Sequence, residues 1–110
     1  MEIKRGTTPV LAVRIGELDA DAQVQSVEFI FKQECSESAQ VLVRKRWPGE
    51  AQRTERGVYR VPLSREETRR FQEGRHMFMD TRVCLAGGAV APGPVSAIMV
   101  RPTLFEEDSQ

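Results

Sequence analysis

Two long segments of this chain alternate apolar with more polar residues, and this alternation constrains the fold more than any other feature. Within residues 24–33 it places Val27, Phe29 and Phe31 on one side. Residues 75–86 repeat the pattern through Met77, Met79, Thr81, Val83 and Leu85. A period of two is typical of a β-strand with one buried side, because successive side chains of a strand point to opposite faces. Both segments are therefore predicted to be strands that cover a core.

Four further segments carry shorter versions of the same pattern: residues 7–15, 40–46, 57–63 and 89–101. Residues 51–56 are expected to form a loop or a short strand, and 16–21 a turn. The stretch Pro92-Gly93-Pro94 is expected to interrupt the last strand, because proline cannot donate a ladder hydrogen bond. Gly87-Gly88 predicts a tight hairpin, since glycine takes positive φ without steric cost.

Six or seven short strands with few helices predict an all-β protein, and an immunoglobulin-like antiparallel β-sandwich fits the length of about 100 residues. The Cys…Trp…Cys spacing of antibody domains is not expected to form a disulfide here, because the strand assignment places the two cysteines in a turn and on an outward-facing side. We expect one continuous core built from residues of several strands: Phe29, Phe31, Tyr59, Val61, Val83, Leu85, Ile98 and Val100.

One helix is predicted, at residues 64–74. Ser64 with Glu67 three residues later forms a capping box, and Gly74 suits the position after a helix end. A helix of this length is marginal alone, so Phe71 is expected to anchor it across an open end of the β core.

With 110 residues, the chain has room for one domain, assigned to 1–104, followed by an acidic flexible tail at 105–110. No apolar run approaches the roughly 18 residues that a membrane helix needs, and residues 1–6 lack the apolar stretch of a signal peptide. We therefore expect no membrane partner, and a protein that stays in the compartment where it is made.

Few residues suggest chemistry. Cys35 and Cys84 are isolated and His76 is the only histidine, so neither a zinc site nor a cofactor is expected. The cysteines are expected to be reduced, with a disulfide as the alternative. The acidic pairs have local structural uses, at turns, at a helix start and in the tail. No nucleophile motif or phosphate-binding glycine loop is recognisable. The sequence therefore predicts a protein that is not an enzyme.

Charge is unevenly distributed along a chain whose total charge is zero. Residues 44–75 hold ten Lys or Arg and five Asp or Glu, whereas the remainder holds six and eleven. This split fits a solvated basic face, a nucleic-acid surface, or complementary surfaces that meet head-to-tail between copies. The sequence pI near 6.6 argues against nucleic acid. The candidate interaction surface consists of Arg44, Arg46, Trp47, Arg53 and Arg56.

Several segments resemble a group of small prophage-encoded proteins of Gram-positive bacteria. They are Lys4-Arg5-Gly6-Thr7-Thr8-Pro9, the strand 27–33, and residues 59–68 followed by Phe71; the strand pair around Gly87-Gly88 keeps the same order. The stretches Met77–Met79 and Ala91–Pro94 depart from that group's pattern. The resemblance implies an immunoglobulin-like sandwich among phage structural components, encoded near tail or baseplate genes. It also implies a bacterial cytoplasmic location before assembly and a virion location afterwards.

These observations lead to one expected function and one alternative. The first is a non-catalytic prophage or virion structural module, a tail- or baseplate-associated adaptor whose partners are other phage structural proteins or further copies of itself. The alternative is a module that binds a small ligand or a carbohydrate, since sandwich domains often carry such sites on their loops. That alternative needs exposed aromatic residues, and only Trp47, Phe78 and Phe105 offer themselves.

Overall fold

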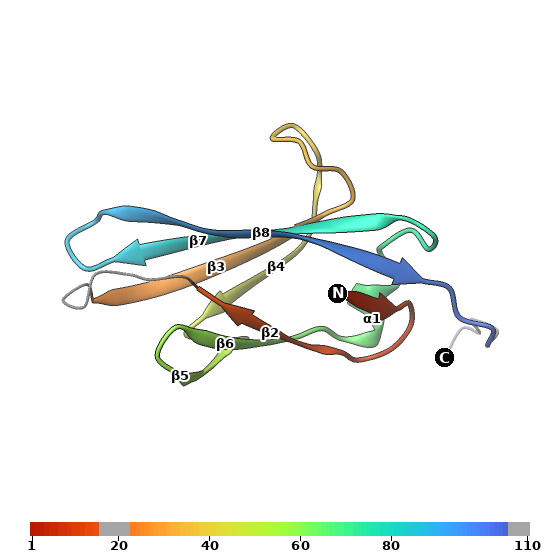
Figure 1. The fold of residues 1–110 in the computed structure, drawn as a ribbon, viewed down its shortest axis with the longest axis horizontal. Helices are drawn as coiled ribbons and strands as arrows, with labels where there is room; N and C mark the ends of the chain where they lie inside the picture. The colour runs from red at the N-terminus through yellow and green to blue at the C-terminus, as the bar shows by residue number, and fades with distance from the viewer. Residues whose placement is uncertain (16–22, 106–110) are drawn as a thin grey trace.

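Two β-sheets packed face to face make up the computed structural model, which describes residues 1–15 and 23–105 (Figure 1). The predicted turn at 16–21 and the tail after Phe105 lie outside the described residues. The described elements are β1 (Glu2–Lys4), β2 (Val10–Arg14), β3 (Val24–Lys32), β4 (Val41–Trp47), β5 (Gln52–Glu55), β6 (Val58–Pro62), α1 (Arg65–Thr68), β7 (His76–Leu85) and β8 (Val90–Arg101).

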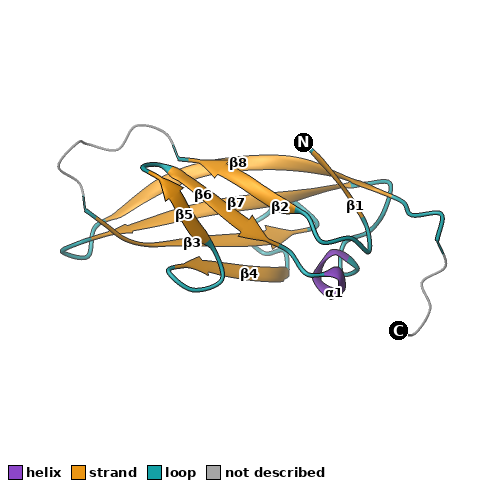
Figure 2. Ribbon diagram, turned by 90° about the horizontal axis from the view of Figure 1, so that it is seen from below, coloured by secondary structure: helices purple, strands orange, loops and turns teal. Residues whose placement is uncertain are grey.

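The strand order confirms the predicted sandwich. One sheet has five strands in the order β1-β8-β7-β3-β4, and the other has three in the order β2-β6-β5. The three-stranded sheet corresponds to strands B, E and D of an immunoglobulin domain, in the order β2, β6, β5. In the larger sheet, β4, β3, β7 and β8 correspond to strands C′, C, F and G. Figure 2 shows the three-stranded sheet crossing the inner face of the five-stranded sheet.

The predicted strand count needs correction, and one strand pair is parallel. The described residues form eight strands rather than six or seven, because β5 is a true strand and β1 was not anticipated. β1 pairs with β8 in parallel, Ile3 standing opposite Val100. A three-residue strand is too short to show an alternating pattern in the sequence, yet Ile3 is buried at the edge of the core.

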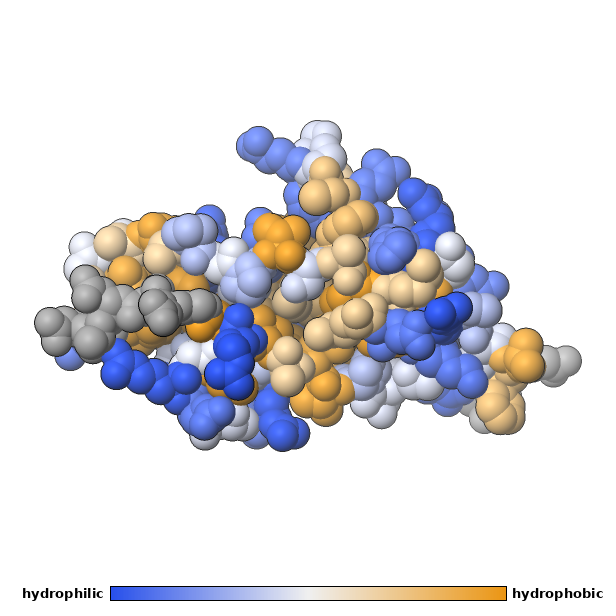
Figure 3. Space-filling model, in the orientation of Figure 1, coloured by the Kyte–Doolittle hydropathy of each residue, from blue (hydrophilic) through white to orange (hydrophobic). Residues whose placement is uncertain are grey.

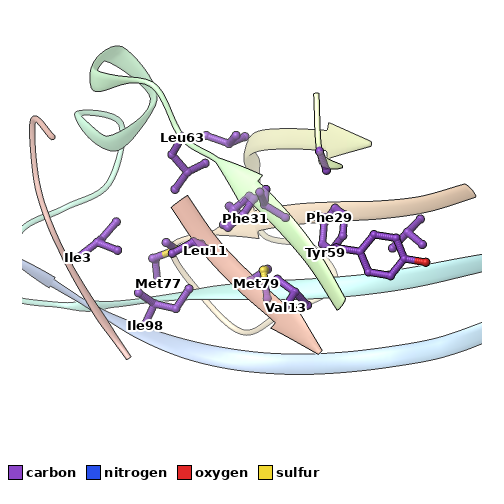
Figure 4. Packing of buried hydrophobic residues seen from close by; sticks show 14 of the residues in the cluster. Ile3, Leu11, Val13, Phe29, Phe31, Tyr59, Leu63, Met77, Met79 and Ile98 are labelled. Carbon is purple, nitrogen blue, oxygen red and sulfur yellow. The ribbon is translucent and has the colours of Figure 1, made fainter. Parts of the chain in front are cut away.

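The core lies between the two sheets and contains the alternating residues that the sequence singled out. Phe29 and Phe31 of β3 are fully buried, and Phe29 meets Tyr59 of β6 with ring centroids 6.1 Å apart. Figure 4 shows Leu11, Val13 and Tyr59 from one sheet directed toward Phe29, Met77 and Met79 from the other. Seven of the eight predicted core residues are buried; the exception, Leu85, is only partly buried against the core.

The predicted helix is shorter than expected, although its cap is confirmed. The Ser64 hydroxyl accepts a hydrogen bond from the Glu67 amide at 3.1 Å, and the Glu67 carboxylate accepts one from the Ser64 amide at 2.8 Å. The α-helix spans only Arg65–Thr68, because the following amides of Arg70 and Phe71 bond three residues back and tighten the turn. Phe71 is buried and its ring lies 6.2 Å from Phe31, so this turn closes one end of the sandwich as predicted.

The proline-rich stretch in the last strand does not interrupt it. β8 continues from Val90 to Arg101, and the irregularity is absorbed as a register shift opposite residues 80–82 of β7. Gly93 lies against Thr81, where an added Cβ would come within 2.7 Å of the threonine side chain. Glycine at this position allows the two strands to stay together.

Candidate functional site

The face of the five-stranded sheet that points away from the three-stranded sheet carries charged and apolar residues in ordered rungs; we call it the outer face. One rung holds Arg46, Glu28 and Arg82, drawn from β4, β3 and β7. The next rung holds Arg44, Ile30, Asp80 and Val95, and the third holds Lys32, Phe78 and Ala97. Because side chains alternate along each strand, these residues share one face while their neighbours enter the core.

A network of charged side chains occupies the first end of the outer face. Glu28 accepts a hydrogen bond from Arg82 at 2.7 Å and another from Arg44 at 3.2 Å, one through each carboxylate oxygen. The hydrogen bond from Arg82 is the main cause of a lowered Glu28 pKa; the charges of both arginines add to it and partial burial opposes it. Arg46 is exposed beside this network, so one carboxylate faces three arginines and this end is basic.

The opposite end of the outer face is acidic. The loop of residues 33–39 stands away from the sheet on the side opposite the three-stranded sheet (Figure 1), held at its base by Lys32, whose Nζ donates to the carbonyls of Ser36 and Glu37 at 3.0 Å. Glu34, Glu37 and Asp80 are exposed, and none of them forms an ion pair with another described residue. Glu34 and Glu37 therefore make this end acidic, whereas Asp80 lies on the rung of Arg44 and accepts a hydrogen bond from the Thr81 amide at 2.8 Å.

An apolar strip separates the two charged ends. Val95 is 59% exposed, and Ile30 and Phe78 are half-buried beside it. Together with the loop they line a pocket of about 350 Å³, and a neighbouring pocket of about 260 Å³ shares Ile30 and Asp80 with it. Figure 3 shows hydrophobic residues at the base of the projecting loop, with hydrophilic residues on either side.

The five residues of the predicted interaction surface do not form one surface. Arg44 and Arg46 lie on the outer face, but Trp47 turns toward the space between the sheets, where its ring meets that of Tyr59 at 5.4 Å. Arg53 of β5 covers Trp47, with its guanidinium carbon 5.5 Å from the ring centroid. Arg56 lies in the β5–β6 turn.

Two aromatic residues within the basic segment 44–75 that could stack on bases, Trp47 and Tyr59, both pack against the core. Tyr59 is 1% exposed, and its burial raises the pKa of its hydroxyl. Trp47 is partly buried between Tyr59 and Arg53. Of the other aromatic candidates, Phe78 belongs to the outer face and Phe105 is 80% exposed near the chain end.

Lys45 of the basic stretch has a structural use. Its Nζ lies 2.7 Å from a Glu67 carboxylate oxygen, with the two side chains only 12% and 16% exposed. Burial raises the Glu67 pKa, but the hydrogen bonds from Lys45 and Ser64 and the lysine charge outweigh it, so the net pKa is lowered. This ion pair ties β4 of the five-stranded sheet to the capped helix α1.

Sequence reasoning missed the residues that complete the outer face: Glu28, Asp80, Arg82 and Val95. Their alternation alone predicts that the first three point away from the core. Glu28 and Arg82 are 54 positions apart, however, and only the register between β3 and β7 brings them together. That register is set by core packing in three dimensions and is not visible as a local motif.

The residues that could suggest chemistry are dispersed. His76 is exposed at the start of β7, Cys35 is exposed in the projecting loop, and Cys84 is half-buried on β7; both cysteines are free, as predicted. Within residues 1–15 and 23–105, no group of three or more His, Cys, Asp or Glu side chains could hold a metal ion. No helix in this part of the chain is long and apolar enough to cross a membrane.

Fold and surface together define a class: an immunoglobulin-like β-sandwich whose larger sheet presents an apolar strip between a basic and an acidic end. Comparison with protein-family models gives no match, and no curated protein matches the chain significantly.

Proposed function

We propose that this chain is a non-catalytic structural module of a prophage or virion, a tail- or baseplate-associated adaptor that acts through protein–protein contacts of its outer face. The observation that carries the proposal is the apolar strip of Ile30, Phe78 and Val95 between charged ends of opposite sign. Exposed apolar residues rimmed by polar ones mark interaction sites on soluble domains. The resemblance to small prophage-encoded proteins adds the biological setting.

The first partner that this surface fits is a second copy of the same chain. Consider two outer faces stacked about a two-fold axis that runs across the strands between the rung of Ile30 and the rung of Phe78. The axis reverses the strand direction, so the acidic loop of each copy lies over the Arg44, Arg46 and Arg82 end of the other. Such an isologous contact is self-complementary, and it closes at two copies. It replaces the head-to-tail arrangement expected from the sequence, because both charged ends lie on one face.

Charge exchange between two variants tests this contact. In a dimer of the Arg44→Glu and Arg46→Glu variant, the new glutamates of each copy would face the acidic loop of the other. The two copies repel each other, so this variant should be monomeric alone. In a dimer of the Glu34→Lys and Glu37→Lys variant, the new lysines of each copy would face the arginines of the other. This variant should also be monomeric because these like charges repel. An equimolar mixture should form a heterodimer, because every contact is then between opposite charges. Light scattering should report about twice the 12.4 kDa chain mass for wild type and mixture only.

Two controls sharpen the experiment. Arg60→Glu changes an exposed arginine of β6, on the other sheet, so it should leave the dimer intact. If the Arg60→Glu variant fails to associate, the three-stranded sheet takes part in the contact, as in a head-to-tail arrangement. Dimerisation should weaken with added salt without disappearing, because charge steers the contact while apolar burial holds it. A wild type that stays monomeric at high concentration in low salt contradicts the proposed contact.

The phage role has a separate test. Mass spectrometry of particles purified after prophage induction should detect the chain with tail or baseplate proteins in a fixed stoichiometry. Its absence from particles and from their assembly intermediates contradicts the structural role, whether or not the purified chain dimerises.

The pocket beneath the projecting loop favours one second candidate, a small-ligand or carbohydrate-binding module. Its volume of about 350 Å³ falls within the range of small-molecule sites, and Phe78 contributes an aromatic wall. A panel of neutral mono- and disaccharides, followed through the amide signals of Ile30 and Phe78, tests it. Saturable shifts in a chain that remains monomeric would favour this candidate over the adaptor.

A further inference from the structure

The two segments that carry most of the sequence resemblance meet in space, at the end of the sandwich closed by α1. The Arg5 guanidinium donates to the carbonyl of Phe71 through Nε at 3.0 Å and to that of Arg69 through Nη2 at 2.9 Å. The Gly6 amide donates to the Thr68 hydroxyl at 3.0 Å, and that hydroxyl donates to the Thr7 carbonyl at 3.0 Å. The segment after β1 is thus fixed on the turn that follows α1.

This junction encloses a pocket of about 150 Å³ that is lined by four cationic side chains: Lys4, Arg5, Arg65 and Arg69. Gly6, Thr7, Thr103 and Phe105 complete its lining. No acidic residue stands among the described residues that line it. A concentration of cationic side chains around one small space attracts an anion.

Arg69 gives the second, independent indication. Its Nε and Nη2 atoms are buried and have no hydrogen-bond partner among the described residues. Buried guanidinium N–H groups without an acceptor are unfavourable, since they have lost water and gained nothing in return. Arg69 also lines the pocket, so a rotation of its guanidinium toward a negatively charged oxygen there would remove the deficit. The planar guanidinium suits carboxylate and phosphate geometry.

Three acidic side chains among the described residues around β1 and α1 are engaged elsewhere. Glu67 pairs with Lys45 at 2.7 Å, and Glu66 with Arg70 at 3.5 Å. Glu2 pairs with Arg101 at 2.9 Å. None of these three carboxylates lines the pocket, so the acceptor that Arg69 lacks is not supplied by them.

We propose that the pocket formed by Lys4, Arg5, Arg65 and Arg69 is a binding site for a single oxyanion, a carboxylate or phosphate group. It lies apart from the outer face and does not depend on the proposed dimer. In a structural module, the carboxylates of an acidic segment on a partner protein supply this chemistry, and a free phosphate supplies the same chemistry from solution.

Titration of the full-length chain with inorganic phosphate and, separately, with a triglutamate peptide tests the site. The amide signals of Gly6, Thr7 and Thr103 should shift saturably, and those of the outer face should not. The titrations are repeated with Glu106→Gln, Glu107→Gln and Asp108→Asn introduced together, which removes the chain's own C-terminal carboxylates as competitors. If the peptide binds at least tenfold more tightly than phosphate, the source is an acidic protein segment; the reverse order assigns the site to phosphate.

Substitution of one arginine supplies the decisive comparison. Arg69→Met keeps much of the aliphatic side chain and removes the unpartnered N–H groups, so affinity should fall at least tenfold. Arg70→Met alters the next residue, which does not line the pocket, and should change affinity less than twofold. Thermal melts of both variants establish that they fold. Equal affinities for wild type and Arg69→Met, or no saturable shift with either probe in either background, would overturn the proposal.

Discussion

The two faces of β3 differ in how deeply their side chains are buried, although they belong to one strand. On the inner face, Val27, Phe29 and Phe31 are completely buried and pack against both sheets. On the outer face, Glu28 and Ile30 remain partly exposed and lie beside residues of β4 and β7. The inner face therefore determines whether the chain folds, whereas the outer face is free to be shaped by what it binds.

A pair of adjacent substitutions should show this contrast most strongly. Phe29→Ala removes a fully buried ring that contacts Tyr59, and large-to-small changes of this kind cost about 3–5 kcal/mol through lost burial and the cavity left behind. Ile30→Ala, one residue away, should cost about 1 kcal/mol, because its side chain stays partly in water before and after. Denaturant melts of both variants measure the difference. Similar losses in the two would mean that the faces are not energetically distinct.

The inner face was also the part that the sequence could predict. Phe29, Tyr59 and Val83 each belong to a strand in which every second residue is apolar. This alternation predicts which side chains are buried, because alternate side chains of a strand share one face. The outer face depends on which strands are neighbours and in what register, and Glu28 meets Arg82 only through such pairing. The anion pocket joins residues 4–7 to 65–69 across the fold, which no local pattern reveals.

Exceptions to this contrast occur where the backbone itself is constrained. Proline on either side of Gly93 predicted a break, yet β8 passes through it by placing the glycine against Thr81. The helix was predicted too long because Gly74 was taken as the residue that follows its end. The α-helix ends at Thr68 instead, where tighter turns begin and lead to the buried Phe71. Tertiary packing decided both outcomes.

Gly93→Ala tests whether the contact with Thr81 holds the two longest strands together. The new Cβ would approach the Thr81 side chain to 2.7 Å and its carbonyl oxygen to 3.0 Å, so β7 or β8 must shift. Overpacking of this kind typically costs about 1–3 kcal/mol. Denaturant melts should show that loss, and hydrogen exchange should be faster at the amides where the two strands pair. A variant as stable as wild type would show that residues 92–94 of β8 can shift away from Thr81 at little cost in stability.

Glu67→Gln should have a slightly smaller effect, which depends on pH. Near neutral pH it leaves the Lys45 ammonium, 12% exposed, without its charged partner, and we expect a loss of about 1–2 kcal/mol. Folding lowers the Glu67 pKa below its ordinary value of 4.5, so the ion pair's stabilisation is present above that value and disappears as pH falls through the folded pKa. Melts from pH 7 to pH 3 should show the two proteins converging. A constant difference over this range would assign the effect to the cap alone.

The smallest effect on stability is expected for Glu28→Gln on the outer face, and this makes it the most informative about function. The carboxylate is 21% exposed and its arginine partners are about 60% exposed, and such exposed pairs contribute only about 0.2–1 kcal/mol. Glutamine keeps the shape of the side chain but leaves Arg44 and Arg82 without a counter-charge, so the basic end of the outer face becomes more positive. In the proposed dimer that end faces the acidic loop of the other copy; the melting curve should barely change while association strengthens at low salt. Light scattering at several concentrations measures this. If Glu28→Gln weakens association, the Glu28 carboxylate itself contacts the partner, and the pairing of the charged ends must be redrawn.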